Sequence, residues 1–140
     1  MTRCRIGFVG AGGVAARHVR TLATLPQADV IAVTDVDPAR AQGFATEHGL
    51  RVVPDVAALL GIGLDAVYVC VPPFAHGALE EAILGAGVAL FVEKPLGLGP
   101  VVPERVARAV ARAGVVTAVG HHWRYSSAVQ HARALLADRP

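Results

Sequence analysis

The sequence is poor in the residues that build disulfide or metal frameworks. It has two cysteines in 140 residues, no Cys-x-x-Cys pair and no histidine cluster near either thiol. A disulfide scaffold or a zinc site would need such spacings. Cys4 and Cys70 fall in or beside expected strands, and we interpret both as buried, reduced, structural thiols. No bound metal is expected.

Clustered charge and long apolar runs are also lacking. The net charge is only +2, and the arginines are scattered singly, so the basic surface of a nucleic-acid-binding protein is missing. The longest apolar run, residues 82–92, has 11 residues, whereas a membrane span needs about 20. The apolar run after Arg3 is too short for a secretory signal. We therefore expect a cytoplasmic protein with neither a nucleic-acid nor a membrane partner.

Hydrophobic residues are abundant, at 54% of the chain. This surplus fits a parallel sheet covered on both faces, and it also fits a face that packs against a part absent from this chain. Apolar runs alternate with helix-like stretches, including residues 74–86 and 103–113. Strands are expected at residues 6–9, 30–34, 51–53, 66–71, 88–92 and 115–119. The pattern predicts an α/β fold with a six-stranded, doubly wound parallel sheet of the Rossmann type.

A glycine-rich turn follows the first expected strand and reads Gly10-Ala11-Gly12-Gly13-Val14-Ala15. In a dinucleotide-binding turn, the first glycine allows a tight turn and the second lets backbone approach a pyrophosphate. A small third residue allows close packing of helix against strand. The unpaired N–H groups of the following helix form an anion site. Such a motif also arises by chance in a glycine-rich chain, so it is weak alone.

Asp35 supports the motif because it ends the second apolar run, twenty positions after Ala15. A carboxylate at the tip of the second strand accepts hydrogen bonds from the adenosine ribose, and its charge repels a 2′-phosphate. The spacing therefore predicts a NAD site, with NADP less favoured.

A charged pair follows the fifth expected strand, in Glu93-Lys94-Pro95-Leu96. Lys94 is the only lysine of the chain, and the other basic residues are arginine. An ammonium group can give up a proton under conditions in which a guanidinium cannot. The ligand crevice of this architecture lies at the same edge of the sheet. Lys94 is therefore a candidate catalytic residue, although a solvated loop end would have the same sequence.

Several segments together resemble one family. They are the glycine turn, Val33-Thr34-Asp35, Val71-Pro72-Pro73-Phe74-Ala75-His76, residues 87–96 with their Glu-Lys-Pro element, and Arg124-Tyr125. These segments resemble the glucose-fructose oxidoreductase and inositol dehydrogenase family, the Gfo/Idh/MocA group. The resemblance covers essentially the whole chain, and the Glu-Lys-Pro element is its specific part.

The resemblance implies a NAD-binding domain at residues 1–120. Residues 121–140 would lead toward a second, antiparallel-sheet domain that is absent from this chain. The implied reaction is hydride transfer between nicotinamide and a sugar- or cyclitol-like secondary alcohol or ketone. In the parent enzymes the second domain covers the substrate and usually supplies a catalytic histidine, so this chain alone is expected to be inactive. Homo-oligomerisation of a full-length parent is left open.

The resemblance also assigns roles to residues. Lys94 would stabilise negative charge on the substrate oxygen and join the proton relay, and Glu93 would help to place it. The Lys94–Pro95 peptide bond is expected to be cis. The motif has Val71-Pro72-Pro73 where many members have Thr-Pro-Asn, so the contact of that Asn is in doubt. Coenzyme contacts are implied for Gly10, Gly12, Gly13, Val14, Ala15, Asp35, Val71, Pro72, His76, Glu93, Lys94 and Arg124.

Three alternatives remain. The paired His121 and His122 could replace the missing proton acceptor, although such pairs are more often surface or domain-contact residues. A regulatory or scaffold module would bind NAD without turnover, and it would have no use for Lys94. An adenosylmethionine-dependent methyltransferase shares the glycine turn and the acid after the second strand, but it gives no account of the Glu-Lys-Pro element.

Overall fold

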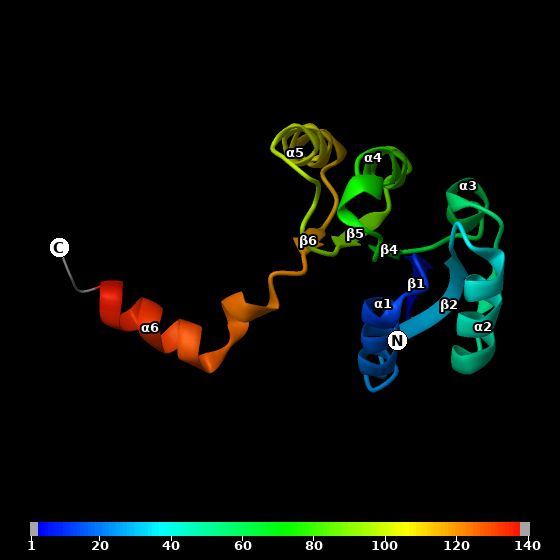
Figure 1. The fold of residues 1–140 in the computed structure, drawn as a ribbon, viewed down its shortest axis with the longest axis horizontal. Helices are drawn as coiled ribbons and strands as arrows, with labels where there is room; N and C mark the ends of the chain where they lie inside the picture. The colour runs from blue at the N-terminus through cyan, green and yellow to red at the C-terminus, as the bar shows by residue number, and fades with distance from the viewer. Residues whose placement is uncertain (1–2, 138–140) are drawn as a thin grey trace.

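The computed structural model describes residues 3–137, which form a six-stranded, all-parallel sheet flanked by helices (Figure 1). Across the sheet the strands run in the order β3-β2-β1-β4-β5-β6. This is the strand order of a dinucleotide-binding sheet. After β3, at one edge, the chain crosses back to the centre of the sheet and forms β4 beside β1. The predicted fold class is confirmed. The strands are β1 (Cys4–Val9), β2 (Ala28–Thr34), β3 (Arg51–Val52), β4 (Ala66–Val69), β5 (Ala89–Val92) and β6 (Thr117–Val119).

Helices cover both faces of the sheet, and each face has its own buried cluster. On one face α1 (Gly13–Leu22) and α2 (Pro38–His48) pack against side chains such as Phe8. On the other face α3 (Val56–Leu60), α4 (Ala78–Gly85) and α5 (Val101–Ala113) pack against side chains such as Val9. Phe8 and Val9 are neighbours, but successive side chains of a strand point to opposite faces. The alternation therefore separates the two clusters.

The last described segment lies apart from the sheet. A 3₁₀ turn, η2 (His122–Tyr125), follows β6 and leads into α6 (Ser127–Ala137), which extends away from the sheet (Figure 1). No residue of α6 is buried. Large apolar side chains are exposed there, namely Trp123, Tyr125, Leu135 and Leu136. Within residues 3–137, none of the helices is long and apolar enough to cross a membrane.

Several predicted boundaries were wrong, and the largest error concerns residues 74–86. A 3₁₀ turn, η1 (Pro73–Ala75), comes first, and α4 begins only after Gly77. Gly77 has a φ of +115°, which no helical residue adopts, so the predicted single helix is interrupted there. At the other edge of the sheet, only Thr117–Val119 pair with β5, so β6 is shorter than predicted. α5 begins two residues earlier than predicted, at Val101.

The prediction that both cysteines are buried is wrong for Cys4, which is exposed at the start of β1. Cys70 is partly buried just after β4, and both thiols are free. Burial raises the pKa of the Cys70 thiol to about 12, and the nearby Glu93 carboxylate adds to the shift. Because a thiolate is the reactive form, Cys70 is a poor nucleophile at neutral pH.

We expect a thiol-specific disulfide reagent at pH 8 to modify only Cys4 in the folded protein. The reaction should be slower than with a free thiol, because partial desolvation and the nearby Asp65 carboxylate raise the pKa of Cys4. Cys70 should react only after unfolding, since its pKa of about 12 keeps it protonated. Absorbance of the released chromophore counts the reactive thiols in native and denatured samples. Rapid modification of Cys70 in native Cys4→Ser protein would contradict its burial.

Candidate functional site

A groove of about 610 Å³ lies at the carboxyl ends of β1, β2 and β4. The sheet order reverses between β1 and β4, and ligands of open α/β sheets bind at such a reversal. The turn after β1, the end of β2 and the loop after β4 all contribute to the lining. The predicted site residues that the structure brings together here are Gly10, Gly12, Gly13, Val14, Asp35, Val71 and Pro72.

Gly10 is required by the backbone itself. Its φ is +96°, and a Cβ added to it would lie 2.4 Å from the carbonyl oxygen of Cys70. The Gly10 N–H donates to the carbonyl of Thr34 at 2.8 Å. The chain can therefore leave β1 between β2 and β4 only if residue 10 has no side chain.

Gly12 and Gly13 have a different reason to be small. A Cβ added to either would meet no heavy atom within 4 Å, so nothing in the chain itself occupies that space. Gly12 is the N-cap of α1 and provides no side-chain cap, which leaves the first N–H groups of the helix open to a ligand. Ala15 lies one turn further and is fully buried, which agrees with its predicted packing role. This turn can therefore accept an anionic group on backbone N–H donors.

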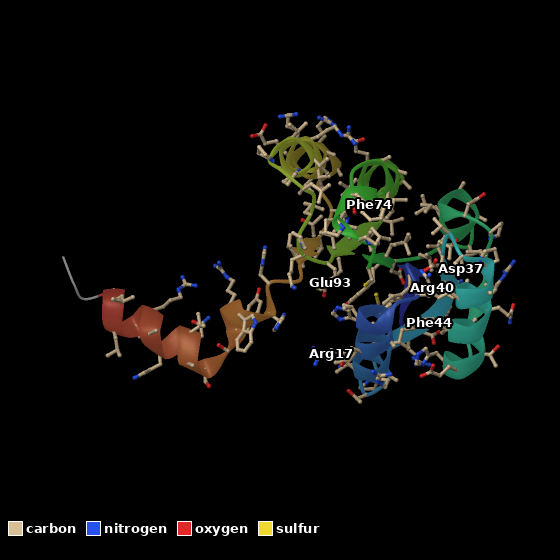
Figure 2. The ribbon with its side chains drawn as sticks, viewed as in Figure 1. Arg17, Asp37, Arg40, Phe44, Phe74 and Glu93 are labelled. Carbon is tan, nitrogen blue, oxygen red and sulfur yellow. The ribbon has the colours of Figure 1, made fainter. Side chains whose placement is uncertain are left out.

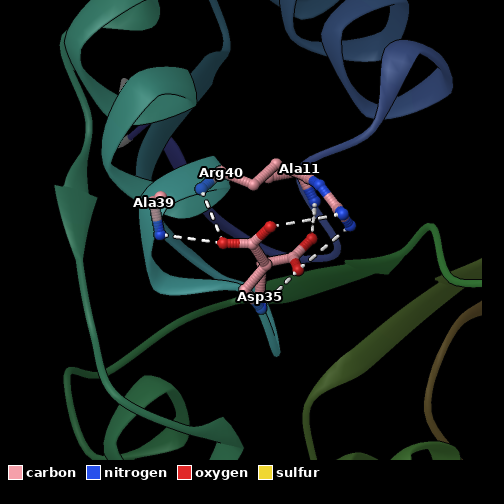
Figure 3. Close-up of polar contacts among 5 residues, drawn as sticks. Ala11, Asp35, Ala39 and Arg40 are labelled. Atoms are coloured by element: carbon pink, nitrogen blue, oxygen red, sulfur yellow. Dashed lines mark hydrogen bonds and ion pairs between the residues drawn. The ribbon is translucent and has the colours of Figure 1, made fainter.

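Asp35 lies directly after β2 (Figure 3). Its side chain is only 6% exposed. One oxygen, Oδ2, accepts from the N–H of Ala11 at 2.8 Å, and Oδ1 accepts from the N–H of Asp37 at 2.9 Å. A carboxylate oxygen offers two acceptor positions. Oδ1 also accepts from the Arg40 guanidinium, whereas Oδ2 keeps capacity for a further donor, such as a hydroxyl of a ligand in the groove.

Arg40 is a groove residue that the sequence interpretation missed. It lies in the first turn of α2, where its guanidinium is 3.4 Å from Oδ1 of Asp35 and 3.4 Å from Oδ2 of Asp37 (Figure 3). Asp37 is the N-cap of that helix and accepts from the N–H groups of Ala39 and Arg40. The sequence did contain a signal for Arg40. Asp37-Pro38 predicts the start of a helix, and Arg40 follows the capping aspartate by three positions, which places the two side chains close together. In NADP-binding relatives of this architecture, an arginine near this position accommodates the 2′-phosphate.

Glu93 and Lys94 lie one strand away from the groove, directly after β5. The Glu93 N–H donates to Val69 of β4 at 2.9 Å, which continues the strand pairing beyond β5. Glu93 lies on the side of α1 (Figure 2). Its side chain is 13% exposed. The Lys94 side chain is exposed, and the predicted cis peptide bond between Lys94 and Pro95 is confirmed. Lys94 takes part in none of the ion pairs found within residues 3–137.

Other predicted residues lie away from the groove lining. The side chain of His76 is fully buried, and its Nδ1 is 2.7 Å from Oε1 of Glu80. Arg124 is exposed in η2, as are His122 in the same turn and His121 directly before it. In the part of the chain that the structure describes, no cluster of three or more His, Cys, Asp or Glu side chains could hold a metal ion.

Residues 4–121 match the model of an oxidoreductase family with an NAD-binding Rossmann fold, Gfo/Idh/MocA. The chain belongs to this family. Among curated members, it is 44% identical over 95 residues to inositol 2-dehydrogenase of Acidothermus cellulolyticus, covering 66% of this chain and 28% of that protein. It is 32% identical over 133 residues to UDP-N-acetylglucosamine 3-dehydrogenase of Acidithiobacillus ferrooxidans, covering 95% of this chain and 42% of that protein.

Several solved structures share the fold. GenD2 from gentamicin A biosynthesis, in complex with NAD, superposes with a TM-score of 0.90 at 30% identity, covering 99% of this chain and 40% of that one. Scyllo-inositol dehydrogenase of Lactobacillus casei, with bound NAD(H) and scyllo-inositol, gives a TM-score of 0.87 at 28% identity. The match covers 97% of this chain and 41% of that one. The chain thus spans less than half the length of these relatives and corresponds to their NAD-binding Rossmann domain.

We expect Gly10→Ala to destabilise the fold by about 1–3 kcal/mol, because the substitution combines an unfavourable φ with backbone overlap. The midpoint of urea denaturation measures this loss. A matched control is Gly43→Ala in α2, where an added Cβ meets no atom within 4 Å. That change should instead stabilise the protein by about 0.5–1 kcal/mol. Equal midpoints for the two variants would contradict the proposed constraint at Gly10.

Proposed function

We propose that this chain is the coenzyme-binding part of a NAD-dependent dehydrogenase acting on a sugar- or cyclitol-like secondary alcohol or the matching ketone. One observation carries the proposal: the open space beside Gly12 and Gly13 shares a groove with the nearly buried carboxylate of Asp35. The printed names of the relatives, which include inositol and UDP-N-acetylglucosamine dehydrogenases, support the polyol and sugar classes of substrate.

The residues of the groove fit a dinucleotide. A diphosphate would lie on the first turn of α1, where the Gly12 cap leaves N–H donors open. An adenosine ribose hydroxyl would donate to the remaining acceptor position of Asp35, on Oδ2. Val14, Val71 and Pro72 line the same groove and would pack against the coenzyme. When bound, the nicotinamide group supplies the hydride acceptor or donor.

Lys94 is the proposed catalytic residue of this chain. When a ketone is reduced, its ammonium, exposed beyond β5, would stabilise negative charge on the substrate oxygen and donate a proton to it. When an alcohol is oxidised, the neutral amine would accept that proton. Glu93 would position the turn, since its carboxylate accepts from the Lys94 N–H at 3.1 Å. Roles near the coenzyme for His76 and Arg124 belong to the same proposal and rest on the family motif.

Family membership favours this function over the two alternative functions considered from the sequence, a regulatory module and a methyltransferase.

We also propose that residues 121–140 lead toward a part of the enzyme that covers the substrate. The exposed apolar side chains of η2 and α6 support this role, because such surfaces are typical of regions that pack against another element. By this proposal the isolated chain binds coenzyme without turnover.

The charges around Asp35 favour NAD over NADP. Two carboxylates, those of Asp35 and Asp37, lie beside the single guanidinium of Arg40. A 2′-phosphate would meet an excess of negative charge there, because two carboxylates already lie 3.4 Å from the one guanidinium. Repulsion between like charges therefore opposes NADP more than Arg40 favours it.

We expect Asp35→Asn to weaken NADH binding by about tenfold, since it weakens the hydrogen bonds that the ribose hydroxyls make to a charged acceptor. Binding of NADPH relative to NADH should improve, because the charge that repels a 2′-phosphate is removed. Fluorescence titrations with each coenzyme measure both effects. Asp29→Asn, at the opposite end of β2, is the control and should leave both affinities within about twofold. Failure of the unmodified chain to bind either coenzyme would contradict the proposed function.

A further inference from the structure

A side-chain hydrogen bond outside the groove connects α1 to the turn after β5. Nε2 of His18 lies 2.7 Å from Oε1 of Glu93, although the two residues are 75 positions apart in the sequence. The side chains are 24% and 13% exposed, so the contact is largely shielded from water. His18 has no role in the site described above, and nothing in its local sequence indicated one.

Aromatic side chains of the sheet hold the His18 ring in place. The ring packs edge-on against Phe91 of β5 and Tyr68 of β4, with centroid distances of 4.9 and 5.5 Å. Tyr68 and Phe91 are paired across the strands and stack at 4.5 Å, and Phe8 of β1 continues the stack at 5.0 Å. The orientation of His18 therefore depends on three adjacent strands and not on α1 alone.

The Glu93 carboxylate is also confined from its other side. Oε2 accepts from the N–H of Lys94 at 3.1 Å, while Oε1 faces His18. A Cβ added to Gly120, directly after β6, would lie 2.8–2.9 Å from all three carboxylate atoms. The carboxylate thus occupies a slot between α1 and the end of β6, and it links both to the Lys94 backbone.

We propose that His18 is a positioning residue for Lys94. By fixing Oε1 of Glu93, His18 keeps Oε2 on the Lys94 N–H and so holds the turn that carries the lysine. The catalytic meaning of this link rests on the proposed function, whereas the link itself does not. Without the His18 donor, Oε1 of Glu93 would be shielded from water and would lack a hydrogen-bond partner. The Glu93 carboxylate would then rotate toward water and release the Lys94 N–H.

The absence of any other lysine gives this proposal a direct test. Reductive ¹³C-methylation labels the Lys94 amine and the terminal amine, whose resonances differ in chemical shift. Hydrogen exchange of the Lys94 amide, followed by NMR, reports on its bond to Glu93. His18→Phe keeps an aromatic ring on Tyr68 and Phe91 but removes the donor. His18→Gln restores a donor through its side-chain amide.

We expect His18→Phe to speed exchange of the Lys94 amide by about tenfold, in line with the loss of one hydrogen bond to a carboxylate, and to shift the Lys94 methyl resonance. His18→Gln should return both signals toward those of the unmodified chain. The control is His48→Phe in α2, because His48 also packs edge-on against an aromatic ring, that of Phe44, and lies 3.6 Å from a glutamate. This control should leave both Lys94 signals unchanged.

Gly120→Ala provides a second, independent perturbation of the Glu93 carboxylate should His18→Phe fold poorly, and it should displace the same Lys94 signals. Unchanged Lys94 signals in the folded variants would overturn the proposal. An NADH titration of the same samples separates the two hypotheses. If the chain binds no NADH but Lys94 responds to His18→Phe, the proposed function fails and the positioning link stands.

Discussion

The carboxylate of Asp35 joins the ends of β1 and β2, and the geometry of the groove depends on that contact. A nearly buried charge requires hydrogen-bond donors, and here the donors are the N–H groups of Ala11 and Asp37 at 2.8 and 2.9 Å. Gly10 brings the same turn against the Cys70 carbonyl of β4. Three strand ends therefore fix the turn on which α1 begins, and with it the uncapped N–H groups at the centre of the proposed coenzyme site.

A second shielded carboxylate, that of Glu93, works in the same way at the other end of the site. Its partners are the ring of His18 and the N–H of Lys94. In both places the anion is held by groups from separate elements, so its position follows from the packing of the sheet. In the proposed function, one anion recognises the ribose and the other holds the turn that carries the reacting ammonium. The packing that stabilises the sheet then also places the residues of the proposed site.

The fold could be predicted from the sequence because its signals are local: apolar runs of strand length, helix caps, and glycines where a strand turns into a helix. The groove residues followed from Gly10 and Asp35, since the spacing of that motif reflects a known geometry. The interruption of the predicted helix at Gly77 could not be predicted. It depends on the positive φ of Gly77 and on the buried contact between His76 and Glu80, which forms only in the folded chain. The contact of His18 with Glu93 was missed for a related reason. It requires knowing which face of α1 lies over β4 and β5.

The most direct test of the central claim is a titration of ¹⁵N-labelled chain with NAD, followed by amide chemical shifts. The claim predicts the largest changes at the amides of Ala11, Gly12, Gly13 and Val14, with smaller changes at the end of β2 around Asp35. Little change should occur at the opposite ends of the same strands. Changes that are absent, or that centre on a surface away from the turn after β1, would contradict the account of this groove as a coenzyme site.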